Sequence, residues 1–287
     1  MRRRSRGGRT LMVFATLAVA CATLVLLSPR GRCALRIAPG FVPYDDDPHI
    51  YYVPGSEPVT ARFAGLLQEA LGEVEARLAA PFRSPFRVYV CPTHEDFARR
   101  IGEPPDTPVR GIKLPKDIWV SPKAFEFFGL DTGKATLAHE LVHLHFGQHL
   151  GLGGRLRPTP SWFEEGVADW IAGTGFERMS RDEAVAAYRS GARLVPDALG
   201  RPLIPRRPPD YGLTWPVFHA QSRMFVEHLH STREESFAVL VRSLHAGTRF
   251  DVAFREAFGR SLEDEWQGFV ESIMSGSPGR VRERGGA

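Results

Sequence analysis

The chain has 287 residues, 43% of them hydrophobic and 24% charged, a composition that excludes a disordered or fibrous protein and allows a sizeable core. Its formal net charge of +4 arises at the two ends, where Arg residues cluster. The chain between them is slightly acidic, so the sequence gives no reason to expect a nucleic-acid partner.

An uncharged segment, residues 11–28, follows the first Arg cluster. As a helix it would be about 27 Å long, close to the thickness of the hydrocarbon core of a bilayer. The preceding Arg residues would stay in the cytoplasm. We therefore expect an N-terminal membrane helix, a signal anchor that holds the rest of the chain outside the cytoplasm, in the periplasm or outside the cell. A cleaved signal peptide ending at Ala18-Val19-Ala20 and a lipoprotein modified at Cys21 are the alternatives.

The remaining chain divides by composition. Residues 29–47 are rich in Pro, Arg and Asp and are expected to form a linker. Residues 48–275 are expected to form the folded domain, and residues 276–287 a disordered basic tail. Cys33 and Cys91 could pair in an oxidising compartment, although their spacing does not decide this.

Strand and helix patterns alternate in the first part of the domain. Strands are expected at 50–53, 86–90 and 118–120, where apolar and β-branched residues gather. An amphipathic helix is expected at 59–78. Thr93 and Asp96 resemble a capping box, which indicates the start of another short helix.

The motif HExxH occupies residues 139–143, within apolar residues at helical spacing. His139 and His143 are four positions apart, so on a helix both lie on one face and can bind the same zinc ion. Glu140 is placed to take a proton from a water molecule beside that ion. These residues indicate a metal-dependent hydrolase.

A second motif, Trp-Phe-Glu-Glu-Gly-Val-Ala-Asp-Trp, spans residues 162–170. A catalytic zinc site needs a third protein ligand, and Glu164 and Glu165 are both candidates. Only Glu165 has an acidic residue, Asp169, one turn further along its face, where a carboxylate that orients a ligating His belongs. We therefore predict Glu165 as the third ligand and Asp169 as the orienting residue for one of the two His. Glu164 is interpreted as a solvated or rim residue.

The segments around and after these motifs are predicted from turn residues and caps. Residues 147–160 are expected to form a loop, and residues 195–209 an ordered loop. His145 and His149 are interpreted as surface residues or as residues of a second layer around the motif. An apolar helix is expected from Tyr211 to about residue 230, and His219, His228 and His230 on it are assigned no role. Further helices are expected, by their caps and Gly stops, at 180–191, 234–246, 252–258 and 261–273.

The two motifs together resemble those of the gluzincin zinc peptidases, the clan of thermolysin and aminopeptidase N, and most closely its bacterial peptidase MA-like families. The chain differs from those families at Asp169, where Glu is common, and at Trp170, where Tyr is common. The resemblance covers about residues 85–275. It implies an α+β, zincin-like fold, in which a small sheet-bearing N-terminal part packs on a mainly helical C-terminal part with zinc between them.

The same resemblance implies peptide-bond hydrolysis, with one Zn²⁺ per chain, Glu140 as general base and peptides or proteins as substrates. Residues 111–120 correspond to the edge strand that substrate joins, and an ordinary strand is the alternative. Tyr211 corresponds loosely to a Tyr that stabilises the oxyanion, and a packing Tyr is the alternative. For the whole protein, the alternative is a catalytically silent zincin-fold envelope protein that acts in binding or assembly.

Overall fold

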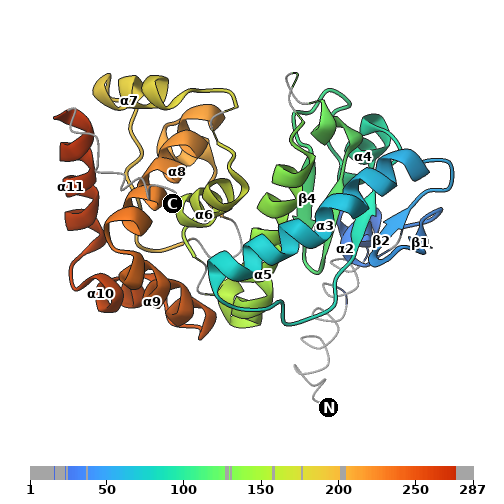
Figure 1. Cartoon of the computed structure of the whole chain (residues 1–287), viewed down its shortest axis with the longest axis horizontal. Coiled ribbons are helices and arrows are strands. Elements are labelled where there is room, and N and C mark those ends of the chain that lie inside the picture. Colours follow the sequence, from blue (N-terminus) through green and yellow to red (C-terminus); the bar gives the residue numbers. More distant parts are fainter. Residues whose placement is uncertain are drawn as a thin grey trace, which may run out of the picture. The chain divides into compact units, whose positions relative to one another are not determined.

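The computed structural model describes residues 25–275 with Thr16 and Thr23, except residues 37, 127–128, 130, 157–158, 176 and 201–204. The chain divides into two compact units, whose elements are labelled in Figure 1. The first unit comprises the residues up to Arg62 together with Phe86–Ala124, and the second comprises Phe63–Pro85 and the residues from Phe125 onward. The boundary falls within helix α3, Glu57–Leu78, which confirms the helix predicted there.

The first unit is built on a five-stranded sheet in the order β1-β2-β3-β5-β4. Its central strands β2, β3 and β5 are parallel, and β1 and β4 pair antiparallel with β2 and β5. The three central strands confirm the three that the sequence predicts. β3 and β5 are fully buried, as expected for strands in the middle of a parallel sheet. The strands are β1 Val42–Tyr44, β2 Asp47–Tyr52, β3 Val88–Val90, β4 Gly111–Leu114 and β5 Asp117–Val120.

Two short helices complete the first unit. Helix α4, His94–Ile101, begins as predicted at Thr93, whose side chain accepts a hydrogen bond from the backbone N–H of Asp96. Helix α2, Pro29–Ala34, and strand β1 lie in the segment expected as a linker. Cys33 of α2 is buried in the same apolar cluster as Cys91, and both thiols are unpaired.

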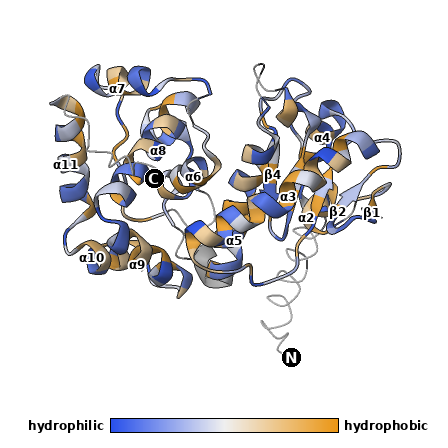
Figure 2. Ribbon diagram, viewed as in Figure 1, coloured by the Kyte–Doolittle hydropathy of each residue, from blue (hydrophilic) through white to orange (hydrophobic). Residues whose placement is uncertain are grey.

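The second unit is helical. Helix α6 packs against both α5 and α8, and α9 packs against α5, α8 and α10. Apolar and polar residues alternate along the ribbons of these helices (Figure 2), because each buries one face and exposes the other. The helices are α5 Gly133–Leu156, α6 Ser161–Ala172, α7 Arg181–Arg189, α8 Trp215–Thr232, α9 Glu234–His245, α10 Phe250–Phe258 and α11 Leu262–Met274, with 3₁₀ turns η1 Pro122–Phe125 and η2 Pro208–Tyr211.

Helix α5 is longer than the sequence predicts, because it continues into the expected loop as far as Leu156, with a kink at Gly151, whose backbone is not helical. The cause is tertiary. His145 and His149 are buried, not at the surface, and their Nε2 atoms lie 2.9 and 3.0 Å from the carbonyl oxygens of Ala80 and Pro81. These contacts extend the helix beyond the point at which its Gly residues would otherwise favour a turn.

The α+β class is confirmed, but the prediction of an N-terminal membrane helix over residues 11–28 was wrong for the described part of the chain. No helix among the described residues is long and apolar enough to cross a membrane. Most of residues 11–28, and all of the predicted tail 276–287, lie outside the described residues. Helix α2, which follows Ser28, has only six residues and carries two Arg, too short and too polar for a span.

Candidate metal centre

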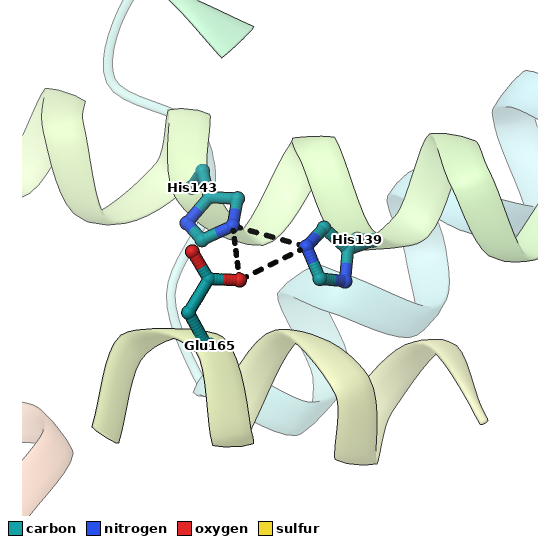
Figure 3. Close-up of side chains that lie close together, drawn as sticks. All are labelled: His139, His143 and Glu165. Atoms are coloured by element: carbon teal, nitrogen blue, oxygen red, sulfur yellow. Dashed lines mark hydrogen bonds and ion pairs between the residues drawn. The ribbon is translucent and has the colours of Figure 1, made fainter. Parts of the chain in front are cut away.

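Helix α5 begins where the side chain of Asp131 accepts a hydrogen bond from the backbone N–H of Gly133, at 3.0 Å. Leu137, Leu141 and Leu144 are fully buried on one side of this helix. That packing fixes the rotation of α5 about its axis. The two His of the HExxH motif therefore project together toward α6 (Figure 3).

Three donor atoms from α5 and α6 form a small triangle. The Nε2 atoms of His139 and His143 are 3.2 Å apart, and Oε2 of Glu165 lies 3.3 Å from the first and 3.4 Å from the second. Ligands about 2.0–2.1 Å from a tetrahedral zinc ion are separated by about 3.3–3.4 Å, so the residues present fit such an ion without rearrangement. The structure thus brings together the three predicted ligands, which could hold a metal ion.

The outward-facing nitrogens of both His are held by carboxylates. Nδ1 of His139 lies 3.1 Å from Oδ1 of Asp169, which answers the question of which His this residue orients. Nδ1 of His143 lies 2.9 Å from Oε1 of Glu164. Glu164, whose side chain is 27% exposed, is therefore more than a solvated or rim residue, because it binds one of the candidate ligands. Each of the two His ligands thus has its own orienting carboxylate, an arrangement typical of His-based metal sites.

The charges around the triangle favour a cation at its centre. Burial lowers the pKa of His139, but Asp169 and Glu165 outweigh it and raise that pKa to about 10. Burial also opposes protonation of His143, yet Glu165 and Glu164 hold its pKa well above the usual value. Burial raises the pKa of Glu165, and the two imidazoles lower it well below its ordinary range. The same field that retains a proton here attracts a metal ion.

Glu140 follows the first ligand directly and is buried, with 9% of its surface exposed. Within the described part of the chain, its carboxylate forms no hydrogen bond or ion pair. Neither of its carboxylate oxygens is among the fully buried atoms that lack a partner, so the carboxylate is open to water while the rest of the side chain is mostly covered. This environment suits the predicted general base.

His219 of α8 is a site residue that the sequence does not single out. Its Nδ1 lies 2.7 Å from Oδ2 of Asp169, and its ring centroid is 6.3 Å from that of His139. Asp169 also accepts a hydrogen bond from Oγ1 of Thr174. Its two carboxylate oxygens thus contact His139, His219 and Thr174. Burial lowers the pKa of His219 and Asp169 raises it, with a net rise. Nothing in the sequence spacing along α8 distinguishes His219 from His228 and His230, the other two His of that helix.

Tyr211 lies in η2, and its hydroxyl donates a hydrogen bond to Oδ1 of Asp197 at 2.6 Å. Burial and Asp197 both hold the pKa of Tyr211 above the usual value. None of its described contacts joins it to the candidate ligands. Its oxyanion role, and the role of residues 111–120 as a substrate-binding edge, stay predictions, although β4 does lie at one edge of the sheet.

No protein-family model matches the chain, and no curated protein matches it. Function is therefore inferred from the geometry of the site and from the two sequence motifs.

Proposed function

We propose that the protein is a zinc-dependent peptidase of gluzincin type, whose ion is held by His139, His143 and Glu165. The observation that carries this proposal is the triangle of donor atoms, with sides of 3.2, 3.3 and 3.4 Å, next to the unpaired carboxylate of Glu140. A structural metal site has no use for such a carboxylate, whereas hydrolysis needs a base at that place.

A bound zinc ion supplies a Lewis acid for the substrate carbonyl and lowers the pKa of water. Glu140 accepts the proton of the attacking water and passes it to the amine nitrogen that leaves when the C–N bond breaks. Asp169 and Glu164 bind Nδ1 of the two His and so keep their Nε2 lone pairs directed into the triangle.

We assign oxyanion stabilisation to His219 rather than to Tyr211. His219 shares Asp169 with the ligand His139, and that hydrogen bond fixes its ring beside the site. When His219 is protonated, a form that the neighbouring Asp169 favours, its Nε2–H can donate to the substrate oxygen that becomes negative in the tetrahedral intermediate. The hydroxyl of Tyr211 is already engaged by Asp197.

Peptides are the proposed substrates because both motifs resemble those of zinc peptidases. The alternative, a silent zincin-fold protein that acts in binding or assembly, does not account for the unpaired Glu140. A protein that only binds would gain nothing from an acidic group at this place, whereas hydrolysis uses it as a base. The complete set of ligands, orienting residues and base therefore favours an enzyme.

The test uses the full chain loaded with zinc and a broad peptide library read by mass spectrometry, with and without a chelator. The wild type should cleave some members, and the chelator should stop it. Glu140→Gln should still bind about one zinc ion per chain yet lose at least about 10²-fold in turnover, because an amide cannot accept the proton. Glu235→Gln, an exposed residue of α9, is the control. Failure to bind zinc, or full activity of Glu140→Gln, would contradict the proposal.

A further inference from the structure

Trp215, the first residue of α8, is the largest exposed apolar side chain among the described residues, with 53% of its surface exposed. Its ring stacks on the imidazole of His219, one helical turn further along, with centroids 5.8 Å apart and an interplanar angle of 21°. The stacking restrains the Trp side chain on one face. The rest of the ring stays exposed, which costs free energy unless something covers it.

The exposed ring is connected to the candidate metal centre by a short series of contacts. Trp215 stacks on His219, the Nδ1 of His219 is bound to Asp169, and Asp169 is bound to the ligand His139. All four residues belong to the second unit. A substrate whose carbonyl lies at the donor triangle therefore passes next to His219 and comes within reach of the ring that covers it.

Single exposed Trp residues are common on protein surfaces, but other exposed apolar residues accompany Trp215. Val195 and Leu199 are also exposed, and they lie on the segment between α7 and η2. This segment is tied to the helices of the site. The backbone oxygen of Asp197 accepts a hydrogen bond from the Trp162 indole of α6, and the backbone N–H of Leu194 donates to Gln221 of α8. Three of the five large exposed apolar residues described in the second unit therefore belong to α8 or to a segment anchored on α6 and α8.

We propose that Trp215 determines substrate specificity, by contacting an apolar and preferably aromatic side chain of the peptide next to the bond that is cut. The inference rests on the proposed peptidase function. An apolar partner follows from the aliphatic residues that accompany the Trp, and from an uncharged ring surface that gains most by excluding water. The alternative is that a positively charged side chain of the peptide lies over the Trp215 ring in a cation–π contact. A Lys peptide in the experiment tests this alternative.

The experiment measures peptide binding to zinc-loaded Glu140→Gln protein, so that the result does not depend on turnover. The probes are peptides identical except for Phe, Leu, Ala or Lys at one position on either side of the central bond. We expect the Phe peptide to bind about tenfold more tightly than the Ala peptide. Trp215→Ala should abolish this preference and Trp215→Phe should keep most of it, with zinc affinity unchanged in both. Met274→Ala, at another residue that is 53% exposed, is the control.

In the active chain, Trp215→Ala should raise KM for Phe peptides by the same factor and leave kcat within about twofold, as expected for a uniform binding contact. Retention of the Phe preference by Trp215→Ala, an equal loss of affinity for every peptide, a preference for Lys, or no binding of any peptide would each overturn the inference. Absence of turnover in the wild type would instead contradict the proposed function, and the binding series would still decide the role of Trp215.

Discussion

Oε1 of Glu164 lies 2.9 Å from Nδ1 of His143, although Glu164 directly precedes the candidate ligand Glu165 in the chain. Neighbouring residues on a helix point about 100° apart, so the two carboxylates cannot both reach the same ion. They reach the same imidazole instead, one at Nδ1 and the other 3.4 Å from Nε2. Both Glu164 and Glu165 therefore contact His143 and belong to the candidate metal site.

The first prediction concerns zinc affinity. Glu165→Ala should weaken zinc binding most, because only two ligands remain. Glu164→Ala and Asp169→Asn should each weaken it by about 10–100-fold, as changes in residues that orient ligands typically do. Dissociation constants measured with a competing chelator test the order, with Glu235→Gln as the control. Wild-type affinity in Glu164→Ala would show that its hydrogen bond to His143 is incidental.

The second prediction concerns His219. His219→Ala should lower kcat by about 10–10³-fold, because it removes one donor to the developing oxyanion. KM and zinc affinity should change little, and His219→Gln, which retains a donor, should recover part of the rate. Steady-state kinetics gives kcat and KM of each variant, and zinc titration of the same preparations gives its zinc affinity. If His219 acted only by holding Asp169, zinc affinity would fall together with kcat in His219→Ala. The His219→Gln variant would then not recover kcat independently of zinc affinity.

The third prediction concerns the packing of α6 on α8 at Gly166. A Cβ at this position would lie 2.6 Å from the backbone oxygen of Ser222 and 2.8 Å from a methyl carbon of Val226. Gly166→Ala should therefore destabilise the protein by about 1–3 kcal/mol, because a helix backbone has to move. Gly268→Ala in α11, where no atom lies within 4 Å, should stabilise it by about 0.5–1 kcal/mol. Urea unfolding of the two variants provides the comparison, and equal effects of the same sign would contradict the packing argument.

The fourth prediction concerns acid stability and the imidazoles of His149 and His245, which pack against each other with centroids 4.2 Å apart. Burial lowers the pKa of both and brings that of His245 to about 3, with the neighbouring His and Arg83 adding to the effect. The folded state thus keeps His245 neutral, while the unfolded chain takes up a proton near pH 6.5. The contribution of these two His to stability should be constant above pH 6.5 and should fall below it by up to about 1.4 kcal/mol per pH unit for each of them.

His245→Phe tests this directly. A Phe can keep the ring contact with His149, and the buried Nε2 of His245 has no hydrogen-bond partner to lose. The variant should lose less stability than the wild type between pH 7 and pH 5 when both are unfolded by urea without metal. An equal loss of stability in both proteins would show that protonation of His245 does not cause the acid sensitivity.

The sequence predicts the parts of the site that depend on geometry within one helix. His139 and His143 share a face because they are four positions apart, and Asp169 marks the face of Glu165 for the same reason. The partner of Glu164 and the identity of His219 depend on how α5, α6 and α8 pack, which no spacing within a helix encodes. The length of α5 was underestimated for a similar reason, since buried contacts of His145 and His149 override the local preference of Gly for turns.

The donor atoms of the candidate site come from two different helices, so a bound ion also fastens α5 to α6. Zinc held at 1,000 times its dissociation constant would add about 4 kcal/mol to the stability of the folded state, comparable to a disulfide. The ion would then govern the lifetime of the protein as well as its chemistry. In a cell short of zinc, the amount of this protein should fall along with its activity, and limited proteolysis with and without a chelator would reveal that dependence.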